Sequence, residues 1–151
     1  MKIIVSKCLL GEACRYDGKS CPDARVIAFC AQSGCTVIPV CPETEGGQMS
    51  TPRISAERVG KRVLRQDGVD VTDAYRAGAE QVLRLAKEEA IPLAVLKSRS
   101  PACGVGQIYD GTFSRTLKEG DGVLAELLKK NGIRVLSEND LASLCEESAQ
   151  K

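Results

Sequence analysis

The chain opens with the stretch KIIVSKC (residues 2–8), a short apolar and β-branched run that ends at a serine and leads into Cys8. A run of this length and composition predicts a buried strand. Similar runs recur at residues 36–40, 92–96 and 133–136. Segments with helical spacing of apolar residues separate them. These segments cover residues 24–32, a long stretch that opens at 72–73, residues 121–130, and a last one from 137 to about 147.

This alternation of strands and helices predicts the fold class. Strands that alternate with helices pair in parallel and are joined by right-handed crossovers. We therefore predict an α/β fold with three layers, in which a mainly parallel sheet carries helices on both faces, as in Rossmann-like and flavodoxin-like proteins. The length fits a single domain over residues 1–151.

The segments between these elements predict loops and one hairpin. Residues 41–53 and 98–111 are rich in Gly, Pro and Ser and have no clear period. Residues 54–71 alternate loosely, and Asp67-Gly68 is a turn signal, so we expect a β-hairpin there. The sequence from Ser137 to Asp140 resembles a capping box at the start of the last helix.

The composition excludes several classes of protein. The 151 residues are 43% hydrophobic and 27% charged, with a net charge of +1. The apolar content is too high for a disordered chain, and a nucleic-acid binder normally carries a clear basic excess. No apolar run approaches the roughly 20 residues of a membrane span. Residues 1–5 are too short for a secretory signal. We expect a soluble cytoplasmic protein without a membrane or nucleic-acid partner.

The chain contains eight cysteines and no histidine. The absence of histidine excludes Ser-His-Asp and Cys-His catalysis, and it excludes mixed Cys/His zinc sites. Any metal must be held by thiolates, with carboxylates as further ligands. Ligation by thiolates favours zinc or iron–sulfur centres.

Three of the cysteines follow three successive predicted strands. Cys8 follows the first strand, Cys41 the second, and Cys103 lies in the Gly-rich loop after the third. Ligands of open parallel sheets bind beyond the carboxyl ends of the strands, where the strand order reverses. We expect these three thiols at one site. Cys30, Cys35 and Cys145 are interpreted as buried inert thiols, and Cys14 and Cys21 are left unassigned.

Two metal centres fit these thiols. Three thiolates suit a cubane iron–sulfur cluster that leaves one iron open as a Lewis acid. A structural zinc ion needs four ligands, and Cys14 or Glu43 could complete such a site. The basic residues that begin at Arg53 and continue at Arg58, Lys61, Arg62 and Arg65 predict a solvated face, from which Arg53 alone could reach the pocket as an anion-binding residue.

Three motifs carry a resemblance to a known family. They are Ser6-Lys7-Cys8-Leu9-Leu10-Gly11 with Arg15-Tyr16-Asp17-Gly18, Cys41-Pro42-Glu43 with Gly46-Gly47 and Pro52-Arg53, and Lys97-Ser98-Arg99-Ser100-Pro101-Ala102-Cys103-Gly104. With these motifs in order, the chain resembles the DUF523 family, also called the thiouracil desulfidase family. The resemblance covers residues 2–147.

The resemblance implies a cofactor and a set of site residues. It implies an oxygen-sensitive [4Fe-4S] cluster held by Cys8, Cys41 and Cys103, whose fourth iron takes the sulfur of a thiolated pyrimidine. It also implies an acidic residue and a serine near the cluster. The matching residues are Glu43 or Glu45, and Ser100.

The function expected from this resemblance is removal of sulfur from a thiolated pyrimidine such as 2-thiouracil by non-redox hydrolysis. A thiocarbonyl sulfur binds an open iron well, and Glu43 would be the general base that activates water or the acid that protonates the ring. Further candidates for substrate contact are Arg15, Tyr16, Glu45 and Arg53. The alternatives are a zinc- or thiolate-containing protein that binds a small anion without catalysis, and a persulfide sulfur carrier.

Overall fold

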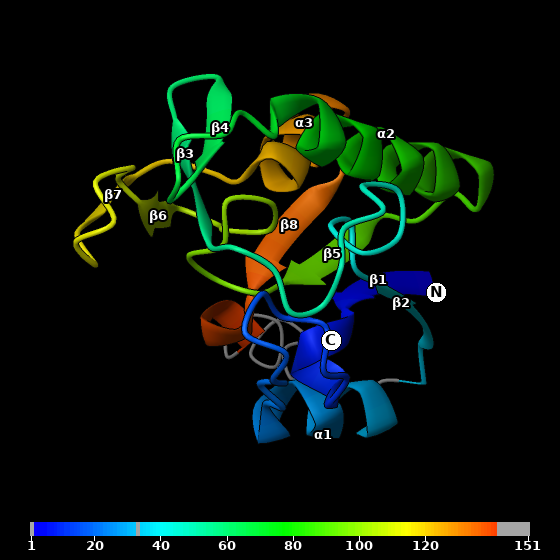
Figure 1. Ribbon diagram of the computed structural model, residues 1–151. Helices are drawn as coiled ribbons and strands as arrows, with labels where there is room; N and C mark the ends of the chain where they lie inside the picture. Colours follow the sequence, from blue (N-terminus) through cyan, green and yellow to red (C-terminus); the bar gives the residue numbers. More distant parts are fainter. Residues whose placement is uncertain (1, 33, 142–151) are drawn as a thin grey trace.

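The computed structural model describes residues 2–32 and 34–141 of the chain (Figure 1). Its centre is a four-stranded sheet in which all neighbouring strands are parallel. The strand order is β2 (Thr36–Val40), β1 (Lys2–Ser6), β5 (Leu93–Leu96) and β8 (Arg134–Ser137). These strands lie where the four apolar runs predict them. The chain steps from β1 to β2 on one side and then to β5 and β8 on the other, so the strand order reverses between β1 and β5.

Helices cover both faces of this sheet, which confirms the predicted α/β fold. Figure 1 shows α2 (Thr72–Glu88) and α3 (Val123–Lys130) together on one side and α1 (Ala24–Gln32) on the other. Helix α2 buries Tyr75, Ala79, Val82 and Ala86 because these positions share one face of a 3.6-residue period.

Two hydrophobic cores hold the layers together, one on each face of the sheet. Alternate residues of a strand point to opposite faces, so neighbours in β1 enter different cores. Ile4 packs with Leu124 and Leu128 of α3, whereas Ile3 and Val26 of α1 lie in the second core. All five side chains have no exposed surface. The packing of both cores fixes the strand ends from which the loops described below emerge.

The predicted hairpin exists, but the position of its turn was wrong. Strands β3 (Ala56–Val59) and β4 (Arg62–Arg65) pair antiparallel, and the chain reverses at Gly60 and Lys61. Asp67-Gly68 forms a second turn after β4, in which Gly68 N–H donates to Arg65 O and Asp70 bridges back to Leu64. Both turns contain a glycine. The β3–β4 pairing forms across the first turn, at Gly60, and only the single bridge from Asp70 to Leu64 forms across the second.

A second hairpin lies in a region where the sequence predicted only loop. Strand β6 (Gln107–Tyr109) pairs antiparallel with β7 (Leu117–Glu119). Each strand has three residues, which is too short to display a period-2 pattern. The loop prediction for residues 98–111 was therefore wrong at its C-terminal end.

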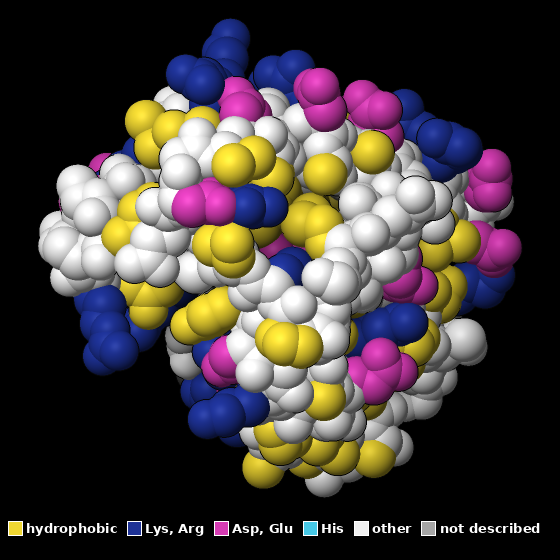
Figure 2. Space-filling view, viewed as in Figure 1, with side chains coloured by type: hydrophobic (Ala, Val, Ile, Leu, Met, Phe, Trp, Pro, Cys, Tyr) yellow, Lys and Arg dark blue, Asp and Glu magenta, His cyan; other side chains and the backbone are white. Residues whose placement is uncertain are grey.

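The capping box predicted after β8 is present. Ser137 Oγ accepts from Asn139 N–H, and Asp140 Oδ2 accepts from Ser137 N–H at 2.9 Å. The expected last helix begins as the 3₁₀ turn η2 (Glu138–Asp140), and its remainder to residue 147, with Cys145, lies outside the described residues. None of the helices in the described ranges is both long and apolar enough to cross a bilayer. On the face drawn in Figure 2, cationic and anionic side chains are interspersed.

Candidate functional site

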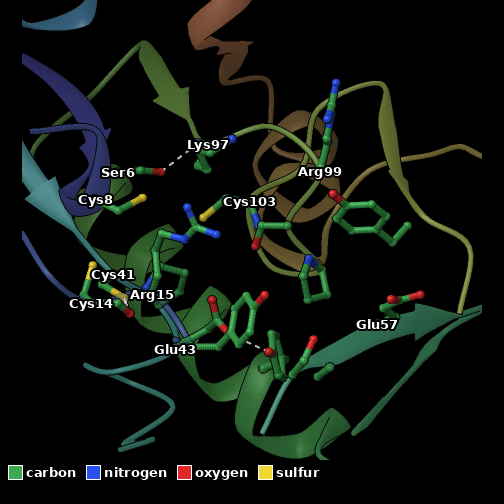
Figure 3. A pocket seen from close by; sticks show the side chains of 18 of the residues that line it. Ser6, Cys8, Cys14, Arg15, Cys41, Glu43, Glu57, Lys97, Arg99 and Cys103 are labelled. Carbon is green, nitrogen blue, oxygen red and sulfur yellow. Dashed lines mark hydrogen bonds between the residues drawn. The ribbon is translucent and has the colours of Figure 1, made fainter. Parts of the chain in front are cut away.

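A cavity of about 530 Å³ lies at the carboxyl ends of β1, β2 and β5, where the strand order reverses. Cys8, Cys41 and Cys103 all line this cavity (Figure 3). Cys8 lies in the 3₁₀ turn η1 (Lys7–Leu10) directly after β1, Cys41 is the first residue after β2, and Cys103 lies in the loop after β5. The structure thus brings together the three thiols that the sequence placed after strand ends.

These thiols are free and buried, with exposed fractions of 8% for Cys8, 7% for Cys41 and 6% for Cys103. A fourth buried thiol, Cys14, lines the same cavity and is hydrogen-bonded to both Cys8 and Cys41. Cys21 is in turn hydrogen-bonded to Cys8. The sequence left Cys14 and Cys21 unassigned because nothing in the loop pattern indicates how the loop folds back over Cys8.

The thiols differ in their readiness to ionise. Hydrogen bonds with Cys14 and Cys21, together with burial, raise the pKa of Cys8. The hydrogen bond with Cys14 and burial likewise raise the pKa of Cys41. Hydrogen bonds with Cys41 and Cys8, aided by the nearby Arg53 charge, lower the pKa of Cys14 to about 3. Cys14 therefore loses its proton more readily than Cys8 and Cys41.

The loop that carries Cys41 and Glu43 is a compact turn against helix α2. Cys41 O accepts from Glu45 N–H at 3.0 Å, and Pro42 O accepts from Gly47 N–H at 2.9 Å. The backbone of Pro42 lies directly on Gly78 of α2, where any side chain would collide with it. The packing of α2 thus fixes the direction in which Cys41 enters the cavity.

The loop that carries Cys103 is held by serine hydroxyls. Ser100 Oγ accepts from Ala102 N–H at 3.1 Å and from Cys103 N–H at 3.2 Å. Ser6 Oγ, at the end of β1, accepts from Lys97 N–H at 3.0 Å and is hydrogen-bonded to the Cys103 thiol. Burial raises the pKa of Cys103 to about 12. The ends of β1 and β5 are therefore joined at the cavity.

Glu43 lies beside the thiols and is held by two side chains. Tyr75 Oη donates to Glu43 Oε1 at 2.5 Å, and Arg53 Nη2 forms an ion pair with the same oxygen at 3.3 Å. The Glu43 side chain is 16% exposed, whereas Arg53 is 8% exposed and Tyr75 3%. Burial and the Glu43 charge raise the pKa of Tyr75, so its hydroxyl remains a donor. Tyr75 was assigned from the sequence only to a helix face.

The remaining predicted residues divide into two groups. Ser100, Arg15 and Tyr16 line the cavity, and the Arg15 guanidinium lies 5.9 Å from the centre of the Tyr16 ring. Glu45 and Arg53 are not among the lining residues. Glu45 accepts from Cys41 N–H at 2.6 Å and pairs with Lys7, so it supports the Cys41 turn from outside.

Arg53 is buried behind Glu43 and is not on a solvated face. Its Nη2 donates to Cys14 O at 3.1 Å, and its Nε is a buried side-chain nitrogen without a hydrogen-bond partner among the described residues. Arg58 is also largely buried and is paired with Glu126. The expectation of one solvated basic face was therefore wrong for Arg53 and Arg58, because each has a carboxylate partner from another part of the chain.

The donor set fits an iron–sulfur cluster. Thiolates are the usual ligands of such clusters, and each thiolate binds a different iron, so the ligands surround the cluster and do not meet at a single point. Cys8, Cys41 and Cys103 enter one cavity from three different strand ends. Within residues 2–32 and 34–141, no group of three Cys, Asp or Glu side chains is close enough to share one metal ion.

The fold and the cavity define an α/β protein with a thiol-lined pocket at the carboxyl edge of a parallel sheet. A family model described as 2-thiouracil desulfurase matches residues 3–140. The chain therefore belongs to this family, which confirms the resemblance found in its three motifs.

Two similar proteins cover nearly the whole chain. The uncharacterized protein YbbK of Bacillus subtilis (strain 168) is 40% identical over an alignment 149 residues long, and the match covers 92% of this chain and 97% of YbbK. The solved structure of the [4Fe-4S]-dependent thiouracil desulfidase TudS (DUF523Vcz) is also 40% identical. It matches with a TM-score of 0.87 over 99% of both chains.

Proposed function

We propose that this protein is a [4Fe-4S]-dependent desulfidase that removes the sulfur of a thiolated pyrimidine such as 2-thiouracil. The observation that carries the proposal is that Cys8, Cys41 and Cys103, all free and buried, line one cavity. Membership of the 2-thiouracil desulfurase family and the likeness to TudS support it. A reducing compartment such as the cytoplasm would keep the thiols available.

The three cysteines are the proposed cluster ligands. When bound, the cluster supplies a Lewis-acidic iron for the soft sulfur of the substrate. Cluster binding requires the thiolate form, so protons must leave Cys8, Cys41 and Cys103, whose pKa values are raised by their surroundings.

Glu43 is the proposed general base. Arg53 and Tyr75 both contact Oε1, so they hold the carboxylate in one orientation at the edge of the cavity. A water that attacks the thiocarbonyl carbon would lose its proton to Glu43. One water is consumed and sulfide is released, without net electron transfer. A positioned base of this kind contributes about 10²–10⁴-fold to the rate.

Ser100 is the proposed hydrogen-bond donor to the substrate. Its oxygen already accepts two backbone N–H bonds. A serine hydroxyl has one donor and two acceptor positions, so its hydrogen is left to bind a carbonyl oxygen or ring nitrogen of the pyrimidine. Arg15 and Tyr16 also line this cavity.

Anaerobic purification tests this function. We expect a brown protein with iron and acid-labile sulfide in an about four-to-four ratio. This protein should release sulfide from 2-thiouracil and leave uracil as the product. A colourless protein that contains one zinc ion and releases no sulfide would contradict the proposal and favour the non-catalytic binding protein instead.

A further inference from the structure

Aromatic side chains are concentrated around the cavity. The chain has three tyrosines, two phenylalanines and no tryptophan. Four of these five residues, namely Tyr16, Tyr75, Tyr109 and Phe113, line this cavity, whereas Phe29 lies on helix α1. Rings of this kind lining a cavity are suited to a planar ligand, against which they stack or pack edge to face.

Phe113 is presented to the cavity by the turn between β6 and β7. Phe113 has a φ angle of 58° and Arg115 one of 62°, so two residues that carry side chains adopt a left-handed backbone in this short segment. Such conformations are unfavourable for residues other than glycine, and they persist where the surrounding structure enforces them. The contacts of this turn must therefore hold Phe113 in place.

The buried carboxylate of Glu57 supplies two of these contacts. Glu57 lies on β3, far from the turn in sequence, and is 7% exposed. Its Oε1 accepts from Gly111 N–H at 2.9 Å and from Phe113 N–H at 3.2 Å. A buried carboxylate is costly unless it is hydrogen-bonded, so this pair of bonds ties the turn to β3.

The packing of Gly111 and the position of Glu57 agree with this arrangement. A Cβ atom on Gly111 would lie 2.6 Å from Val59 Cγ2, so the turn rests directly on β3. Figure 3 shows Glu57 across the pocket from Cys8, Cys14 and Cys41. The turn that Glu57 holds therefore builds the wall on that side.

We propose that Phe113 is a specificity-determining residue that packs against the heteroaromatic ring of the substrate, and that Glu57 is the positioning residue that fixes Phe113 in this place. The inference rests on the proposed function and adds to it the residue that selects a planar ring. The thiols would hold the cluster on one side of the cavity, and Phe113 would hold the substrate ring from the other side. The recognised feature is the flat ring of the pyrimidine, separately from its sulfur.

Steady-state kinetics of the cluster-loaded enzyme test the role of Phe113. Phe113→Leu removes the ring but keeps apolar bulk, so we expect KM for 2-thiouracil to rise about tenfold while kcat stays within about threefold. Phe113→Tyr should keep KM within about threefold of the original. Phe29→Leu is the matched control and should change neither constant. An unchanged KM in Phe113→Leu would overturn the proposal.

Calorimetric titration with uracil separates this inference from the proposed function. Uracil has the ring but no sulfur, so its binding does not depend on desulfidation. We expect Phe113→Leu to weaken uracil binding about tenfold and Phe29→Leu to leave it unchanged. Suppose that the unaltered protein turns over no 2-thiouracil, but Phe113→Leu still weakens uracil binding and Phe29→Leu does not. The proposed function then fails, and the ring-binding role of Phe113 stands. If uracil binds equally to both variants, the ring site fails.

A double-mutant cycle tests whether Glu57 acts through Phe113. Glu57→Gln keeps a carbonyl oxygen for both N–H groups and should preserve KM, whereas Glu57→Ala should raise KM as Phe113→Leu does, with unchanged iron content. Both substitutions remove the same interaction, namely the packing of Phe113 against the substrate ring. Adding Glu57→Ala to Phe113→Leu should therefore raise KM by less than about twofold. If the KM effects of the two substitutions multiply, or if Glu57→Ala loses both kcat and iron, Glu57 has a general structural role. Either result would overturn its role as the positioning residue of Phe113.

Discussion

A Cβ atom on Gly78 would lie 2.0 Å from the carbonyl oxygen of Pro42, so helix α2 and the Cys41 loop meet backbone to backbone. Gly46 of the same loop faces α2 equally closely, because a Cβ there would lie 2.8 Å from the Gly78 Cα atom. The loop that carries both Cys41 and Glu43 therefore packs directly against α2 at Gly78. This contact couples the packing of α2 to the geometry of the proposed site.

Replacement of Gly78 by alanine should disturb the site from outside the cavity. In a helix interior, Gly→Ala usually stabilises by about 1 kcal/mol. Here the added methyl group would push Pro42 away and displace Cys41 and Glu43. We therefore expect Gly78→Ala to lower the iron content and the melting temperature. Glu80→Ala, on an exposed position of the same helix, should change neither quantity. A stabilised Gly78→Ala protein with full iron content would contradict the prediction.

Single cysteine replacements should identify the cluster ligands. We expect Cys8→Ser, Cys41→Ser and Cys103→Ser to lose most of the iron and the visible absorbance after anaerobic purification. Cys30→Ser should keep both, because Cys30 lies on α1 and packs in the second core. The measurement is iron and acid-labile sulfide per chain.

The replacement of Cys14 tests whether this fourth thiol of the cavity is also a cluster ligand. Cys14 lines the cavity and contacts Cys8 and Cys41, yet it is not one of the three proposed ligands. Cys14→Ser should therefore retain about four irons per chain. Loss of the cluster from this variant, to the extent seen in Cys41→Ser, would indicate ligation by four cysteines.

Neutralising the two candidate carboxylates should distinguish their roles. Glu43→Gln removes the proposed base, so kcat for sulfide release should fall about 10²–10⁴-fold at unchanged iron content. Glu45→Gln keeps an acceptor for Cys41 N–H and should retain most activity. Tyr75→Phe removes one hydrogen bond to Glu43, which is worth about 0.5–1.5 kcal/mol. If Glu45→Gln lowered kcat strongly and Glu43→Gln did not, the general base would be Glu45.

The stability of the β4–α2 junction should depend on pH through Asp70. Hydrogen bonds from Thr72 and Arg62 lower the pKa of Asp70 to about 2. A carboxyl whose pKa is lowered by folding stabilises the native state above its unfolded pKa and loses this effect as the pH falls toward its folded pKa. Asp70→Asn should therefore melt at a lower temperature near neutral pH. The difference should shrink as the pH falls from about 4 to about 2. A difference that stays constant over this range in thermal melts would contradict the assignment.

Much of the fold could be predicted because its patterns are local. The β-branched run in β1 and the 3.6-residue spacing of Tyr75, Ala79 and Val82 in α2 each lie within one element. The same local pattern put Cys8 and Cys41 directly after strands, and parallel strands bring such positions to one edge. The convergence of these thiols on one cavity was therefore accessible from the sequence.

Contacts between distant segments were not accessible in this way. No local pattern indicates that Arg53 lies behind Glu43, that Cys14 contacts Cys41, or that Glu57 holds the turn of Phe113. Each of these pairs is formed when loops fold back over the sheet. The three-residue strands β6 and β7 were missed for a related reason, since their pairing is stabilised by neighbours and not by their own composition.

The amino-acid sequence by itself determined the order of the helices and of the strands in the parallel sheet, the family, and the thiols that follow the strand ends, because hydrophobic period and motif spacing are properties of neighbouring residues. Only the tertiary structure decided which polar and aromatic side chains surround those thiols. Cavity walls are built from segments tens of residues apart, and the packing of both cores sets their relative positions.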